Sequence, residues 1–243
     1  MKSVILCEGG TDLTLLQYYL EKVHDWKYDK TESELNIFRI RKWFKKNNGN
    51  KLLIGACGGV KNIPAKFDDI LDYNSISDDE GFDKIIIVTD RDEHTTVSEF
   101  DTCIKEKLMN REISIDGDIE NNMWKQIRYT DELGQQKVIE MILLVIPFEE
   151  KGALETFLLN ALSYADDTEE KVINQCNAFI DNIDTDGKYL TSRRHITKAK
   201  FDVYFSIRTP LEQFTERRTI LRGVNWEEYT EIQIQFRELE KLG

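Results

Sequence analysis

Three short apolar segments in the first 90 residues are each followed by a turn and by a stretch with helical spacing. They are SVILC at 3–7, LLIGAC at 52–57 and KIIIVT at 84–89. Nearly continuous apolar runs of this length are typical of strands buried on both faces, and a helix after each strand favours a parallel sheet. The alternating segment 124–130 and the long apolar run 138–148 predict a hairpin that returns to a fourth core strand.

From Gly152 onward the spacing of apolar residues becomes helical. We therefore predict an α/β protein with a mostly parallel sheet of about four core strands flanked by helices. Residues 1–165 form the α/β domain in this prediction, and residues 166–243 form a helical region packed on it. The segments with helical spacing are 154–162, 172–180, 195–207, 211–221 and 226–239.

Charge is distributed along the chain in blocks of opposite sign. The 243 residues include 33 Lys and Arg against 45 Asp and Glu, a net charge of −12 that argues against a protein coating nucleic acid over its whole surface. Residues 37–66 contain eight basic residues and no acid, residues 67–120 contain seventeen acids and five bases, and residues 188–223 contain nine bases and three acids. Two basic blocks thus flank an acidic centre, either as strips for nucleic acid or as solvated surface.

Two further patterns narrow the class of protein. No apolar run approaches 18 residues, so the sequence predicts no membrane span and no membrane partner. The four cysteines have neither CxxC spacing nor a histidine at ligand spacing, which argues against a zinc cluster. We expect a reduced, cytoplasmic protein.

Carboxylates follow two of the predicted strands directly. Glu8 and Asp12 come after the first strand, and Asp90 and Asp92 come at the end of the third. The carboxyl ends of parallel strands meet at one edge of a sheet, so these acids are expected to converge there. Clustered carboxylates are stabilised by a hard divalent cation such as Mg²⁺, whereas each acid alone is also explained as a helix cap or first-turn residue. The second interpretation suits Asp12 best.

The segments VILCEGGTD at 4–12 and IIIVTDRD at 85–92 together resemble the TOPRIM domain. This metal-binding α/β domain occurs in topoisomerases, bacterial primases, RNase M5-type nucleases, recombination-repair proteins and OLD-type nucleases. Its signature is an apolar strand ending in Glu-Gly with an Asp a few residues on, followed by a later strand ending in Asp-x-Asp. The segment LIGACGG at 53–59 resembles its middle strand and glycine turn, and the resemblance covers about residues 3–165.

The TOPRIM resemblance implies a role for each of these acids. Glu8 matches the general acid/base, and Asp90 and Asp92 match the acids that hold Mg²⁺ or Mn²⁺, with Asp12 in support. Glu155 resembles an additional acid of OLD-type proteins and of small stand-alone TOPRIM-related proteins of unknown function. The alternative for Glu155 is a first-turn residue favoured by the helix dipole.

The basic residues and glycines near these motifs are further candidates. Lys198 and Lys200 match the lysine that OLD-type nucleases place near the site, and a solvated helix face is the alternative. Gly9 and Gly10 allow a ligand to approach the backbone closely. The turn of Gly58 and Gly59, together with Lys61, has the composition of a phosphate cradle or of a plain strand-to-helix turn.

The function predicted from these motifs is that of a Mg²⁺- or Mn²⁺-dependent TOPRIM phosphodiesterase, a nuclease acting on DNA or RNA. No GxxxxGK[ST] motif and no primase zinc motif occurs, so we expect a stand-alone TOPRIM protein with a helical cap. One alternative is a non-catalytic, metal-dependent module that binds nucleic acid or a protein partner. Another is a Rossmann-like enzyme acting on a small phosphorylated ligand. Whether the chain forms a homodimer stays open.

Overall fold

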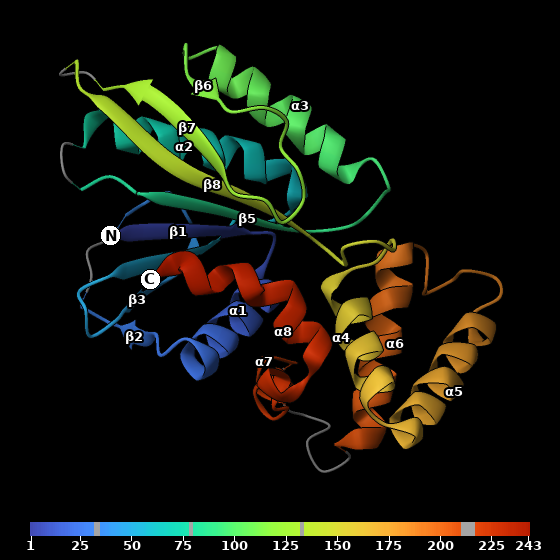
Figure 1. Cartoon of the computed structure of the whole chain (residues 1–243). Helices are drawn as coiled ribbons and strands as arrows, with labels where there is room; N and C mark the ends of the chain where they lie inside the picture. Colours follow the sequence, from blue (N-terminus) through green and yellow to red (C-terminus); the bar gives the residue numbers. More distant parts are fainter. Residues whose placement is uncertain (32–34, 78–79, 132–133, 210–216) are drawn as a thin grey trace.

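The computed structural model describes residues 1–31, 35–77, 80–131, 134–209 and 217–243. An eight-stranded sheet lies at the centre, in the order β2-β3-β4-β1-β5-β8-β7-β6, with helices on both faces (Figure 1). The strands are β1 Lys2–Cys7, β2 Lys27–Asp29, β3 Ile40–Lys45, β4 Lys51–Ala56, β5 Lys84–Asp90, β6 Ser114–Ile115, β7 Lys125–Thr130 and β8 Gln136–Ile146.

The sheet is mixed, and the prediction of a mostly parallel sheet is wrong. Three parallel pairings join β4, β1, β5 and β8 in the centre, whereas four antiparallel pairings among the described strands attach β3 and β2 on one side and β7 and β6 on the other. The flanking strands are short or only partly buried, so they lack the apolar runs that reveal the central ones. The predicted hairpin is confirmed, because β7 pairs antiparallel with β8, which then runs parallel beside β5.

Both faces of the central strands are buried, which explains their composition. Along β1 the side chains of Val4 and Leu6 pack into the apolar core on one face, and those of Ile5 and Cys7 pack into the core on the other. All four side chains are completely buried. Helices α2 (Ile63–Ile76) and α3 (Thr96–Met109) cover the first face, and α1 (Gly10–Val23) covers the second (Figure 1).

The remaining helices belong to the core on the α1 face. Helices α4 (Leu154–Ala165), α5 (Asp167–Ile183) and α6 (Arg193–Arg208) pack on one another beyond the carboxyl ends of the strands. The last segments of the chain return to α1 (Figure 1). Phe201, Trp226 and Phe236 join the same apolar cluster as Ile5 and Leu16, so the C-terminal region shares its core with the sheet. The last segments are α7 Arg217–Arg222, η3 Trp226–Glu228, α8 Thr230–Phe236 and η4 Arg237–Leu242.

The sequence-based boundary at residue 165 falls at the junction between α4 and α5. The helix expected over 195–207 is α6. The helix expected over 211–221 lies partly outside the described residues, and α7 covers its end. No helix in the described ranges is long and apolar enough to cross a membrane.

Candidate functional site

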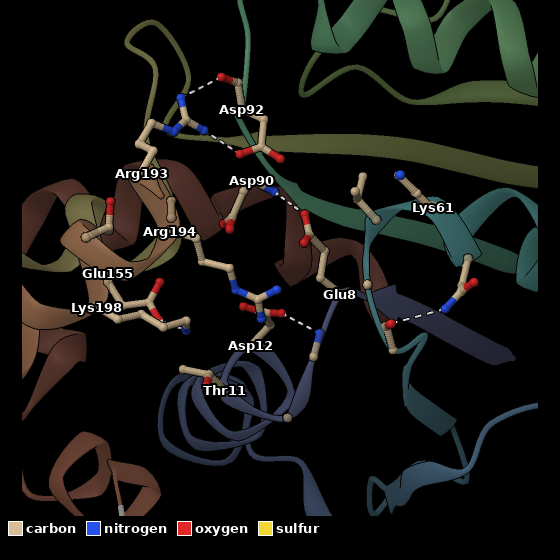
Figure 2. A pocket seen from close by; sticks show the side chains of 18 residues that line it. Glu8, Thr11, Asp12, Lys61, Asp90, Asp92, Glu155, Arg193, Arg194 and Lys198 are labelled. Atoms are coloured by element: carbon tan, nitrogen blue, oxygen red, sulfur yellow. Dashed lines mark hydrogen bonds and ion pairs between the residues drawn. The ribbon is translucent and has the colours of Figure 1, made fainter. Parts of the chain in front are cut away.

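Glu8 and Asp90 lie side by side at the carboxyl edge of the sheet. Glu8 follows β1 and Asp90 ends β5, and the parallel register of these two strands brings them together. The Oε1 atom of Glu8 accepts a hydrogen bond from Thr89 Oγ1 at 2.6 Å. It accepts another from the Asp90 N–H at 2.9 Å (Figure 2). Both bonds go to one oxygen, which fixes the carboxylate and leaves Oε2 without a hydrogen bond to any described residue.

Asp12 and Asp90 also hold the starts of two helices. Asp12 Oδ2 accepts the Gly9 N–H at 2.7 Å in the first turn of α1, and Asp90 Oδ1 accepts the Leu154 N–H at 2.8 Å at the start of α4. The interpretation of Asp12 as a first-turn residue is therefore confirmed. It does not compete with a place in the site, because both carboxylates also line the same cavity.

The local electrostatics make these two acids easy to neutralise. Burial raises the pKa of Asp12 from 3.8 to about 7, and the nearby carboxylates of Glu8 and Glu155 act in the same direction. Burial, followed by the charges of Asp12 and Glu8, raises the pKa of Asp90 well above its ordinary value. Carboxylates held together in this way gain stability from a proton or a bound cation.

Glu155 and Lys198 form an ion pair inside the same region. Glu155 lies in the first turn of α4 and is only 5% exposed, and Lys198 Nζ on α6 donates to its Oε1 at 2.7 Å. Lys200 does not line the cavity and donates to Asp181 on α5 at 2.9 Å. Residues two apart on a helix point in different directions, so only Lys198 reaches the acids.

Asp92 lies at the rim of the cavity, apart from the buried acids. Its side chain is 55% exposed, and its carboxylate pairs with the guanidinium of Arg193 on α6. The Asp92 carbonyl accepts a second hydrogen bond from Arg193 at 2.6 Å (Figure 2). Arg193 therefore contacts both the carboxylate and the carbonyl oxygen of Asp92.

The pair Gly58 and Gly59 and the pair Gly9 and Gly10 differ in whether their backbone conformation requires glycine. The N–H groups of Gly58 and Gly59 both donate to the Glu8 carbonyl at 2.9 Å, so they tie two strand ends together and are not free to hold a phosphate. Both glycines have positive φ, +81° and +120°, which favours glycine for conformational reasons. Gly10 needs no such conformation, and a Cβ placed there meets no other atom within 4 Å. Both Gly9 and Gly10 line the cavity, and a Cβ at Gly9 would lie 3.8 Å from Asp12 Oδ2.

The strand register divides the basic block 37–66 between two ends of the sheet. Ile40, beside Arg39, pairs with Ala56 next to the Gly58 turn, so this part lies at the edge that carries the acids. Lys45 pairs with Lys51 at the opposite edge. A single continuous strip along residues 37–66 is therefore not formed.

A cavity of about 720 Å³ brings most of the candidate residues together. Glu8, Asp12, Asp90 and Glu155, which we call the acidic cluster, line its centre. The loop from Gly58 to Asn62 with Lys61 lies on one side, and Arg193, Arg194, Thr197 and Lys198 from α6 lie on the other (Figure 2). Sequence reasoning missed Thr89, Arg193 and Arg194. The charge count over 188–223 includes both arginines but gives no reason to place them here.

The donor chemistry of the acidic cluster suits a hard divalent cation, because carboxylate oxygens are the ligands that Mg²⁺ and Mn²⁺ prefer. In the described part of the chain, however, no group of three or more His, Cys, Asp or Glu side chains is arranged so that it could hold a metal ion as it stands. Ligation by this cluster therefore requires its side chains to move toward one another. A bound cation would offset the repulsion between these carboxylates, which together with burial raises the pKa values of Asp12 and Asp90.

The fold and cavity define an α/β protein with an acidic site at the carboxyl edge of a mixed sheet. The chain belongs to the family described as protein of unknown function (DUF3226), whose sequence profile matches residues 2–230. No curated protein matches the sequence.

Among solved structures, the chain is similar to a hypothetical protein, PH0156, from Pyrococcus horikoshii OT3. The two are 20% identical, the alignment covers 98% of this chain and 99% of the other, and the TM-score is 0.51, which indicates a shared fold. A glyoxalase/bleomycin resistance protein/dioxygenase family enzyme from Burkholderia phytofirmans PsJN also matches, at 11% identity, 58% and 97% coverage and a TM-score of 0.19.

Proposed function

We propose that this protein is a Mg²⁺- or Mn²⁺-dependent phosphodiesterase of the TOPRIM type that acts on DNA or RNA. The observation that carries the proposal is the acidic cluster. Four carboxylates, one directly after β1 and the others on α1, β5 and α4, line one cavity at the carboxyl edge of four mutually parallel strands. The order of the motifs along the chain, Glu-Gly after one central strand and Asp-x-Asp after its neighbour, supports the TOPRIM assignment.

Asp12, Asp90 and Glu155 would hold the metal, which supplies positive charge for the phosphate and for the oxygens that gain charge in hydrolysis. The proposal leaves Asp92 outside this set while it pairs with Arg193. Lys198 shares Glu155 and adds a positive charge beside the same centre. In the described part of the chain these acids are not yet arranged around a common point, so they would have to move toward one another as the metal binds.

Glu8 acts as the general acid/base in this proposal. Its Oε1 is held by Thr89 and by the Asp90 N–H, so Oε2 is the oxygen that can take a proton from a water or give one to a leaving oxygen. Fixing one oxygen through two hydrogen bonds limits the carboxylate to one orientation. Such positioning is what proton transfer to a reacting group requires.

The test is a cleavage screen of single- and double-stranded DNA and RNA with Mg²⁺, with Mn²⁺ and with EDTA. We expect cleavage by the wild type with metal and its loss in Asp90→Asn, which keeps an oxygen to accept the Leu154 N–H. Glu106→Gln is the matched control, because Glu106 is exposed on α3 and does not line the cavity. Cleavage at the wild-type rate by Asp90→Asn would falsify the assignment.

A small phosphorylated ligand is the second candidate substrate, and the cavity volume favours it. Sites for small molecules typically measure about 300–1,000 Å³, a range that includes this cavity. The same screen therefore includes mononucleotides and sugar phosphates. Release of phosphate from these compounds, with nucleic acids left intact, would select this candidate.

A non-catalytic metal-dependent module is the third candidate. The pairing of Glu155 with Lys198 and of Asp92 with Arg193 favours it, because both pairs withdraw acids from metal binding. Calorimetric titration with Mn²⁺ distinguishes it: binding that depends on Asp90, without turnover of any substrate, would select the module.

A further inference from the structure

Two consecutive arginines begin α6 and line the cavity opposite the Gly58 turn. Ser192 caps the helix, with its Oγ accepting the His195 N–H at 3.3 Å, and this fixes Arg193 and Arg194 in the first turn. Neighbouring residues on a helix point about 100° apart. Arg193 accordingly reaches Asp92 at the rim, and Arg194 extends toward the acidic cluster (Figure 2).

The position of these arginines conflicts with a local rule of helix stability. The start of a helix carries partial positive charge, so acids are favoured there and cations are disfavoured. The first turn of α6 nevertheless contains two arginines and no acid. Helices α2 and α7 also lack an acid there, whereas α1, α3, α4 and α5 each have one or more. Residues that oppose local stability are typical of functional sites.

Neither Arg193 nor Arg194 forms contacts that contribute much to the stability of the fold. Arg194 is exposed and forms no hydrogen bond or ion pair with any residue in the described ranges. Arg193 has the ion pair with Asp92 and a hydrogen bond to the Asp92 carbonyl at 2.6 Å, but both side chains are about half exposed, 49% and 55%. Exposed ion pairs contribute little to stability because water and salt screen them. A ligand phosphate can therefore replace Asp92 at small cost.

The acidic cluster creates the need for such cations. A phosphate chain entering this cavity meets four carboxylates, and like charges in a partly buried site repel. Lys198 is already paired with Glu155. Guanidinium groups bind phosphate oxygens through two parallel hydrogen bonds, so Arg193 and Arg194 have the chemistry to offset the repulsion.

We propose that Arg193 and Arg194 bind phosphate groups beside the scissile one, with Arg193 leaving Asp92 to do so. The substrate is then a polynucleotide with at least one further phosphate next to the cleaved bond, and a single phosphodiester makes no use of the pair. This inference rests on the proposed function and narrows its substrate class.

Binding and turnover are measured separately to test the inference. Fluorescence anisotropy with a labelled oligonucleotide in EDTA gives the Kd and its salt dependence without any cleavage. We expect Arg193→Gln together with Arg194→Gln to weaken binding by about tenfold and to reduce the slope of log Kd against log salt by about one for each arginine. Arg222→Gln is the matched control, because Arg222 is exposed on α7 and does not line the cavity.

Turnover is then compared with Mn²⁺ on the oligonucleotide and on bis(4-nitrophenyl) phosphate, a diester without flanking phosphates. The double variant should raise the KM for the oligonucleotide, and its loss in kcat/KM should be at least about tenfold larger for the oligonucleotide than for the small diester. An unchanged Kd and salt slope in the double variant overturns the inference, as does an equal loss on both substrates. Absence of any cleavage by the wild type counts against the proposed function alone, because the anisotropy result still decides the role of the arginines.

Discussion

The two ends of β1 differ in how well their charged side chains are compensated by neighbouring groups. At the amino end, Lys2 is the charged group, and its Nζ lies 5.5, 5.0 and 5.0 Å from the ring centres of Trp43, Tyr73 and Phe82. The same Nζ donates to Tyr73 Oη at 3.0 Å and to the Glu80 carbonyl at 2.8 Å. One cation is thus fully partnered by rings and oxygens, as expected of a charge that serves stability.

At the carboxyl end, four carboxylates share one cavity and their charges are only partly compensated. Lys198 pairs with Glu155, while burial and mutual repulsion raise the pKa values of Asp12 and Asp90. The charge at the amino end of β1 therefore has favourable partners, whereas the carboxylates at its carboxyl end repel one another. Unresolved electrostatic conflict in a cavity is typical of sites that bind a ligand or carry out chemistry.

The largest effect is expected at Glu8. Glu8→Gln keeps an oxygen to accept from Thr89 and from the Asp90 N–H, so the fold should remain, while proton transfer is lost. We expect kcat for nucleic-acid cleavage to fall by about 10²- to 10⁴-fold with little change in KM. Steady-state kinetics with Mn²⁺ measure this, and circular dichroism checks the fold. A fall of less than about threefold would remove Glu8 from the chemistry.

The repulsion between carboxylates at the carboxyl end of β1 should lower the free energy of unfolding in a pH-dependent way. The folded pKa of Asp12 is about 7 against 3.8 ordinarily, so the unfolded chain releases this proton more readily and metal-free stability falls as pH rises from about 4 to about 7. Asp12→Asn removes this penalty and should raise the free energy of unfolding at pH 8 by about 2 kcal/mol, with the gain vanishing at pH 4.

Urea denaturation in EDTA at several pH values measures the gain from Asp12→Asn. Asp186→Asn, at an exposed position, is the matched control and should change stability by less than about 0.5 kcal/mol at any pH. Equal or lower stability of Asp12→Asn at pH 8 would show that the acidic cluster carries no net strain.

The amino end should respond in the opposite direction. Lys2→Met retains much of the side-chain volume but loses the contacts of the cation with the three rings and two hydrogen bonds. We expect a loss of about 1–2 kcal/mol in the free energy of unfolding and no change in kcat/KM. Lys171→Met, exposed on α5, serves as the control. Reduced activity of Lys2→Met with unchanged stability would contradict the assignment of a purely stabilising role to the amino end of β1.

The sequence was most informative where burial is complete. The central strands read as continuous apolar runs because both their faces are covered, and Glu8 and Asp90 come at the residues where those runs stop. Strands β2 and β6 have three and two residues and follow no detectable period. Their pairing depends on neighbours brought beside them by the fold, and so the three antiparallel pairings that involve β2, β3 and β6 could not be predicted.

In the site, too, the acids at the ends of the buried strands could be predicted, whereas the contacts that depend on distant parts of the chain could not. Gly58 and Gly59 have the composition of a phosphate cradle, but the neighbouring strand supplies the Glu8 carbonyl that takes their N–H groups. Arg193 and Arg194 lie about 100 residues beyond Asp92, and only the path of α4, α5 and α6 brings them back to the cavity. Local pattern carries no information about such returns of the chain.

The smallest structural effect is expected at Gly10, and it separates ligand approach from backbone need. Gly59→Ala forces a side chain into φ +120° and should cost about 1–2 kcal/mol of stability. Gly10→Ala places its Cβ in open space at ordinary φ, so its stability should lie within about 0.5 kcal/mol of wild type. Because that space belongs to the cavity, Gly10→Ala should still lower kcat/KM by obstructing substrate. Thermal unfolding and kinetics on the same preparations decide the matter: full activity in Gly10→Ala would mean that no substrate atom approaches the start of α1.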